Sequence, residues 1–176
     1  MIYTRVSYNT QNWINPSGSE GKSISNTTFE SCGFGMEEWL FNDLFLKDGD
    51  HYGYIEGLKG YREGDENEPL ILFSIHHSSK DRYIVAIIDQ WEKLDTTEAS
   101  VLINDFSQPI SEIRNQISIL QNINIELALQ NFDRHISNNT FFNIKFKSFE
   151  LLNGEPLSAE HPVQNYYRFQ MNNRNH

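Results

Sequence analysis

The chain has 176 residues, a length typical of one domain with its own core, and residues 1–176 are interpreted as a single domain. Its net charge of -10, from 24 acidic and 14 basic residues, argues against a uniformly basic, nonspecific nucleic-acid-binding surface but allows a local basic groove. A lone cysteine, Cys32, excludes an internal disulfide and a multi-cysteine zinc site. With no export leader and no long apolar run, the sequence predicts a cytoplasmic protein.

The first half of the chain begins with a predicted strand. Residues 2–8 alternate and are rich in Tyr, Val and Thr, and a long stretch of turn-forming residues follows them. Residues 33–41, with the sequence GFGMEEWLF, predict a glycine-hinged entry into a short helix. A second strand is expected over residues 51–59.

Two strongly apolar runs, residues 70–76 and 82–91, predict an antiparallel hairpin with residues 83–88 buried. Asp95 and Glu98 have the spacing of a capping box, which predicts a helix ending near residue 104. From residue 109 to 137 the apolar residues recur with helical spacing, and the pattern breaks near residues 121–124. Two packed helices explain this pattern.

The last part of the chain predicts a return to strands. Residues 141–150 alternate as a strand, Asn153 and Gly154 indicate a turn, and residues 166–171 are expected to close the sheet. Strands at both ends with helices between them predict an α+β fold with a mostly antiparallel, barrel-like sheet flanked by helices.

No motif predicts a catalytic residue, a metal site or a cofactor. Residues 16–23 imitate a phosphate-binding loop only in their last three residues, because Pro16 replaces the first glycine and no helix pattern follows. His76 and His77 are adjacent on a predicted strand, so their side chains point to opposite faces and do not chelate one ion. A hydrolase built on Cys32 and a distant histidine is a third-choice alternative.

Aromatic residues in loops and at the ends of elements are the main functional signal. A planar ligand such as a flipped base is held between rings and read by polar groups on its hydrogen-bonding edge, and Trp or Tyr beside Asn or Asp supplies both parts. The candidate base pocket comprises Trp13, Asn15, Trp39, Asn42, Asp43, Tyr52 and Tyr54. Asp81 is a further candidate for reading the base edge.

Basic side chains near these segments are candidates for contacting DNA phosphates. They are Lys22, Lys59, Arg62, Lys80 and Arg82, with Lys145 and Lys147 as further candidates.

The order of elements resembles the PUA-like superfamily, which includes the EVE, YTH and SRA base-reading domains. The resemblance is carried by residues 3–13, by the hairpin at residues 70–91 with its RYIVAI core, and by the late strand NIKFK followed by Pro-Leu-Ser. In addition, GFGMEEWL followed by HYGY resembles the N-terminal region of some bacterial modification-dependent restriction proteins, in which a reader precedes a nuclease such as an HNH domain.

The resemblance implies a domain that binds double-stranded DNA and flips a modified base, such as 5-methylcytosine, into an aromatic cage. It also implies that the domain functions in a type IV-like restriction system, with a fused or associated nuclease domain as partner and no membrane contact. The alternative, from the net charge of -10, is an acidic protein-interaction or DNA-mimic module that reads no base.

Overall fold

In a computed structural model of the protein, the described residues are 1–22, 33–61, 68–152, 154–166 and 172–173. Their strands are β1 (Ile2–Arg5), β2 (Leu46–Lys47), β3 (Asp50–Gly53), β4 (Leu70–Ile75), β5 (Arg82–Lys93), β6 (Ile144–Leu151) and β7 (Asn172–Asn173). Their helices are α1 (Thr96–Asp105), α2 (Ser107–Ser118) and α3 (Ile125–Ser137), with the short 3₁₀ helices η1 (Asp43–Phe45), η2 (Glu56–Gly60) and η3 (Pro162–Asn165). The fold is α+β, as predicted.

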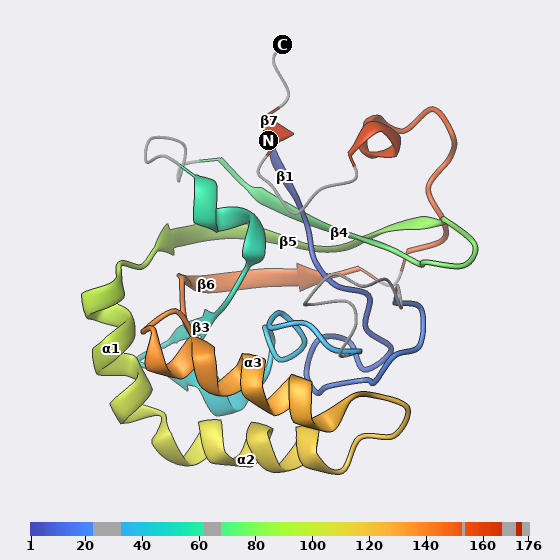
Figure 1. Ribbon diagram of the computed structural model, residues 1–176. Coiled ribbons are helices and arrows are strands. Elements are labelled where there is room, and N and C mark those ends of the chain that lie inside the picture. The colour runs from blue at the N-terminus through green and yellow to red at the C-terminus, as the bar shows by residue number, and fades with distance from the viewer. Residues whose placement is uncertain (23–32, 62–67, 153, 167–171, 174–176) are drawn as a thin grey trace.

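The strands form one sheet in the order β2-β3-β6-β5-β4-β1-β7 (Figure 1). Neighbouring strands are antiparallel except β1 and β4, which run parallel with Ile2 beside Leu70. The predicted mostly antiparallel sheet is therefore confirmed. Because this order ends at β2 on one side and at β7 on the other, the described sheet is open and does not close into a barrel.

The predicted hairpin is confirmed as β4 and β5, and its pairing extends from Leu70 opposite Ile88 to Ile75 opposite Arg82. A bulge lies beside Leu72 and Phe73. This bulge shifts the alternation along β5, so that Val85 and Ala86 are both buried while Ile84 and Ile87 are only half-buried. Tyr83, predicted to be buried, is also half-buried.

The helical predictions are confirmed as well. The side chain of Asp95 accepts hydrogen bonds from the backbone of Thr97 and Glu98, and the Glu98 side chain accepts one from Asp95 N, which completes the capping box of α1. Between α2 and α3 the helical pattern is interrupted, and the side chain of Asn124 caps α3 by accepting from Leu127 N. Across the described ranges, no helix combines the length and apolar content that a membrane crossing requires.

The prediction of a short helix within residues 33–41 is wrong. This segment is a series of turns, in which Glu38 N donates to Gly35 O and Leu40 N to Glu37 O. Its residues are buried all round, so the segment has no polar face to turn toward solvent. The Glu38 side chain accepts from Gly35 N at 2.7 Å, so a side-chain bond replaces the backbone ladder of a helix.

The predicted strand over residues 51–59 ends early, because β3 ends at Gly53 and η2 begins at Glu56. The side chain of Asn143 explains why the strand ends at Gly53. Its side-chain oxygen accepts from Ile55 N and its side-chain nitrogen donates to Ile55 O, each at 2.8 Å. One amide side chain thus satisfies the backbone groups that a neighbouring strand would otherwise have bonded.

Toward the C-terminus, β6 begins at Ile144, later than the predicted start at Phe141, because Phe141 and Phe142 pack into the helical core instead. β7 pairs with β1 at the edge of the sheet. Residues 153 and 167–171, which carry the predicted turn and most of the predicted closing strand, lie outside the described residues.

The core is layered, and irregular segments occupy the middle layer. In Figure 1 the three helices lie along one side of the molecule, and turns from the first third of the chain lie between them and the sheet. Trp39 and Phe45 from these turns pack with the helices, whereas Leu40 and Phe41 pack with the sheet residues Leu72 and Ile88. The opposite face of β4 packs against Val163 of η3.

Candidate functional site

Two aromatic residues of the predicted base pocket are core residues. Trp39 has no exposed surface and its ring is stacked with those of Phe34 and Phe141, with centroids 6.1 and 5.7 Å away. Tyr54 is 1% exposed and its hydroxyl donates to Glu56. Both rings belong to the helical core, so neither offers an open face to a ligand in this structure.

Four other predicted pocket residues lie near one another in the turns around Ile14. Trp13 is buried and its indole nitrogen donates to Ser7 O at 2.8 Å. Asn42 donates to Ile14 O and caps η1, which begins at the exposed Asp43. The backbone oxygen of Asn15 accepts from Asn9. The side chain of Asn42 is thus engaged with backbone groups of these turns, whereas Asn15 takes part through its backbone oxygen.

Tyr52, the remaining predicted pocket residue, lies apart from that group, half-buried on β3. Its ring packs against Phe106 at 5.7 Å and Phe142 at 6.5 Å. The structure therefore divides the predicted pocket among the core, the turns around Ile14 and β3.

The predicted phosphate contacts are also separated. Lys22 is buried in an ion pair, Lys59 is exposed and paired with Glu56, and Arg62 lies outside the described residues. Arg82 is 3% exposed and donates to Gln164 at 2.8 Å. Lys80 is exposed on the turn between β4 and β5.

Half-buried rings gather where the loop after β1 meets the turn between β4 and β5. We call Tyr8, His76 and Tyr83 the Tyr8 cluster. The ring of Tyr8 lies 4.9 Å from that of His76, in edge-to-face contact, and 6.3 Å from that of Tyr83. All three side chains are half-buried, so they present both a fixed position and an accessible surface.

Gly21 completes the Tyr8 cluster with its backbone. A Cβ atom at this position would lie 2.2 Å from Cδ1 of Tyr8 and 2.9 Å from Cδ2 of His76, so only glycine fits. Its φ of +68° is also one that glycine adopts at low cost. Gly21 O accepts from His77 N at 2.8 Å, which joins this loop to the turn after β4.

Behind the Tyr8 cluster lies a network of buried polar groups around two consecutive glutamates. The Glu38 carboxylate has no exposed surface and accepts from Asn9 Nδ2 at 3.0 Å and Ser17 N at 2.7 Å. Lys22 Nζ lies 2.7 Å from Glu38 Oε1, and its side chain is 6% exposed. This carboxylate is therefore fully hydrogen-bonded and its charge is neutralised.

Glu37, the neighbouring acid, is in a different environment. It accepts from Ser7 Oγ at 2.7 Å and from Glu56 N at 3.2 Å. Burial raises the pKa of the Glu37 carboxyl above its ordinary value, the Glu56 carboxylate adds to the rise, and the hydrogen bond from Ser7 opposes it. Burial thus disfavours the charged form of the Glu37 carboxyl, and buried acids with a perturbed pKa often mark functional sites.

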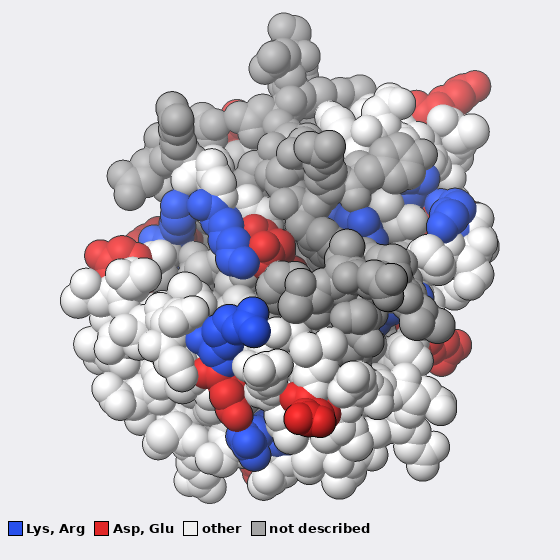
Figure 2. Space-filling view, in the orientation of Figure 1, with Lys and Arg blue, Asp and Glu red and all other residues white. Residues whose placement is uncertain are grey.

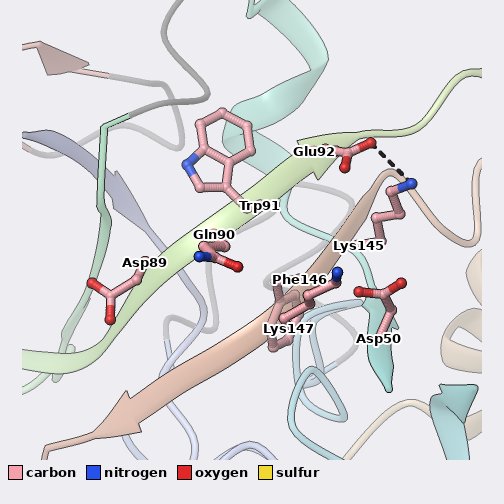
Figure 3. A pocket seen from close by; sticks show the side chains of 8 residues that line it. All are labelled: Asp50, Asp89, Gln90, Trp91, Glu92, Lys145, Phe146 and Lys147. Atoms are coloured by element: carbon pink, nitrogen blue, oxygen red, sulfur yellow. Dashed lines mark ion pairs between the residues drawn. The ribbon is translucent and has the colours of Figure 1, made fainter. Parts of the chain in front are cut away.

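A separate polar groove of about 360 Å³ lies over β5 and β6 (Figure 3). Lys145 reaches Glu92 at 2.9 Å, and Lys147 lies between Asp89 and Asp50 in this view. The rings of Trp91 and Phe146, from the same strands, are buried in the core between the sheet and the turns. The groove therefore offers charges of both signs, and the two aromatic residues in its lining, Trp91 and Phe146, are only 3% and 1% exposed.

The surface charge bears on the two predicted functions. Figure 2 shows Lys and Arg interspersed with Asp and Glu over the described part of one face, without a continuous surface of either sign. The described part of that face therefore lacks the unbroken negative surface that a DNA mimic requires. No group of three His, Cys, Asp or Glu side chains in the described ranges is placed to hold a metal ion. Cys32 lies outside those ranges.

The sequence interpretation missed Tyr8, Glu37 and Glu38 as members of a site. Tyr8 lay at the end of a predicted strand, and the glutamates lay in a predicted short helix. The available signal was the position of two acids inside an otherwise apolar, aromatic segment. Comparisons with protein-family models, curated proteins and solved structures return no significant match, so the function is inferred from the residues themselves.

Two buried histidines predict that the fold loses stability in mild acid. Burial lowers the pKa of His51, whose ring is stacked on Phe146, and also that of His135. A base with a lowered pKa in the folded state contributes stability above its unfolded pKa of about 6.5, and this stability is lost as the pH falls through that value.

The measurement is urea unfolding at pH 7.5 and pH 5.5. His51→Phe keeps an aromatic ring beside Phe146 but cannot bind a proton, so it should lose less stability than the wild type between the two pH values. Comparing the variant with the wild type cancels the opposite effect of Glu37, whose protonation favours the folded state. An equal loss in both proteins would contradict the role of His51.

Proposed function

We propose that the chain is a DNA-recognition domain that reads a modified base, with the Tyr8 cluster as the stacking surface. The observation that carries the proposal is the gathering of three half-buried rings, Tyr8, His76 and Tyr83, at the junction of two loops. A base taken out of the duplex is held by stacking on such rings, which are fixed in place and still accessible.

Polar groups suited to the rest of the task adjoin the rings. The Tyr83 hydroxyl is protonated at neutral pH and can donate, and burial and the nearby Asp81 carboxylate both raise its pKa further above the ordinary value of about 10. Asp81 can accept a hydrogen bond from an exocyclic amino group such as that of cytosine. Lys80, exposed on the same turn, is the proposed phosphate contact.

The proposed fold relationship is to the PUA-like superfamily. It is supported by the α+β architecture, by the mostly antiparallel sheet and by the confirmed hairpin, which carries Tyr83 on β5 and His76 directly after β4. The proposed modification is on cytosine, and the proposed setting is a modification-dependent restriction system with a fused or associated nuclease. The proposal moves the stacking surface from Trp13, Trp39 and Tyr54, which are buried in the core, to the loops around Tyr8.

The test is a fluorescence titration of labelled duplexes that carry cytosine, 5-methylcytosine or 5-hydroxymethylcytosine at one central position. The wild type should bind one modified duplex at least about 10-fold tighter than the unmodified one, which corresponds to about 1.4 kcal/mol. Tyr8→Ala and Tyr83→Ala should each weaken that binding by roughly 5- to 150-fold, the range for loss of one base–aromatic stack.

Tyr166→Ala is the matched control. Tyr166 is also a half-buried tyrosine with aromatic neighbours, but it packs on Tyr3 and Phe73 at the opposite face of the sheet. The Tyr166→Ala variant should bind the preferred duplex with the same affinity as the wild type. Equal binding of every duplex would overturn the function. If Tyr52→Ala loses binding and Tyr8→Ala keeps it, the base pocket would instead be the one predicted from the sequence.

A further inference from the structure

Tyr8 is held from both sides by the two buried glutamates. Ser7, before it in the chain, donates to Glu37 at 2.7 Å, and Asn9, after it, donates to Glu38 at 3.0 Å. Glu37 and Glu38 are themselves consecutive and buried. Two side-chain bonds therefore fix the backbone on each side of Tyr8.

Lys22 fixes the other component of the Tyr8 cluster, the backbone at Gly21. Its ammonium group lies 2.7 Å from Glu38 Oε1 and donates to Gly33 O at 3.1 Å, to Ser17 Oγ at 3.3 Å and to Gly18 O. Three segments of the chain thus meet at one buried ammonium. Gly21 directly precedes Lys22 and fits against Tyr8 and His76, so the residue that packs on those two rings is adjacent to this anchored lysine.

We infer that the buried Lys22–Glu38 ion pair positions the Tyr8 cluster, and that Lys22 is a positioning residue for ligand binding with no phosphate contact of its own. The inference rests on the proposed function for its ligand. A lysine that is 6% exposed, with four oxygen partners, has neither the accessible surface nor a spare donor for a phosphate. Lys22 is therefore reassigned from the phosphate contacts predicted from sequence.

The first experiment needs no DNA. In protein labelled with 13C at the tyrosine ε carbons, the Tyr8 resonance reports the ring current of His76, which lies 4.9 Å away in edge-to-face contact. Lys22→Met should shift this resonance. Gly21→Ala should shift it too, because its Cβ collides with the Tyr8 ring while the ion pair stays intact. Gly21→Ala thus tests the contact between Gly21 and the Tyr8 ring, and Lys22→Met tests the ion pair that holds Gly21 in place.

Lys47→Met is the matched control for the resonance. Lys47 forms an ion pair of the same length, 2.7 Å, with Asp105, but both side chains are exposed and neither contacts the Tyr8 cluster. It should leave the Tyr8 resonance in place. An unmoved Tyr8 resonance in folded Lys22→Met would overturn the inference, whatever the DNA measurements show.

The second experiment measures how DNA affinity depends on salt concentration, which distinguishes a positioning role of Lys22 from a phosphate contact. The slope of log affinity against log salt concentration changes by about 0.9 for each phosphate of duplex DNA that a variant no longer neutralises. Lys22→Met should weaken binding of the preferred duplex by about 5-fold or more, the lower limit for removing one base–aromatic stack, with an unchanged slope. Lys80→Met should change the slope by about 0.9.

A changed slope in Lys22→Met would make Lys22 a phosphate contact and overturn the inference while leaving base reading intact. Absence of binding by the wild type to any duplex would overturn the proposed function. In that case the Tyr8 resonance in Lys22→Met still decides whether the ion pair positions the ring.

Discussion

Trp39→Ala is expected to destabilise the fold by about 3–5 kcal/mol, the range for removing a large buried aromatic side chain. Trp39 has no exposed surface and contacts three rings, with Phe34 and Phe141 stacked on it and Phe132 meeting it edge-on at 5.6 Å. Its truncation leaves a cavity between α3 and the turns of the first third of the chain.

Urea unfolding of the purified variant measures this loss. Trp39→Phe is the matched control, because it keeps an aromatic ring between Phe34 and Phe141, and its loss should be clearly smaller. A Trp39→Ala protein with wild-type stability and abolished DNA binding would contradict the core assignment and restore Trp39 to a ligand pocket. Destabilisation with unchanged affinity of the folded fraction would support the core assignment.

Glu38→Ala is expected to cost a similar amount, about 3–5 kcal/mol, because it leaves the buried Lys22 ammonium without its counter-charge. It also removes the acceptor of Ser17 N, Gly35 N and Asn9 Nδ2. Each of these donors then carries the cost of an unmade hydrogen bond. Thermal or urea unfolding at pH 7.5 measures the loss.

Glu37→Gln is the matched control at the neighbouring buried acid, because its amide oxygen can still accept from Glu56 N while its amide nitrogen can donate to Ser7 Oγ. A carboxyl with a raised pKa in the folded state costs stability once the pH rises above its unfolded value, and the cost is complete above its folded pKa. The amide avoids this cost, so Glu37→Gln should equal or exceed the wild type in stability at pH 7.5. A loss as large as that of Glu38→Ala would show that Glu37 is ionised and paired.

Local patterns in the sequence were sufficient for the elements whose side chains interact with near neighbours. The hairpin of β4 and β5 follows from two apolar runs and a short turn, and α1 follows from the reciprocal bonds of Asp95 and Glu98. The break between α2 and α3 follows from the loss of helical spacing near residues 121–124. In each case the stabilising contacts are made between segments that are close in the chain.

The candidate site depends on distant partners, and this is why its residues could not be predicted. Ser7 meets Glu37 across 30 residues, and Ile55 meets Asn143 across 88. These bonds turn a predicted helix into buried turns and end a predicted strand at Gly53. Trp39 looked suited to a ligand because its segment is aromatic, but the same composition also suits a core.

The order of strands along the chain leaves one edge of the sheet unpaired while the rest of the chain is still being synthesised. The first partner of β5, β4, directly precedes it in the chain, but its other partner, β6, begins only at Ile144, after all three α-helices. During that interval β5 is an edge of 12 residues with unpaired backbone groups, the kind of surface on which chains aggregate. Asp89, Glu92 and Lys93 lie along this edge, and such charges oppose pairing between chains. The charged lining of the groove in Figure 3 thus also protects the nascent sheet.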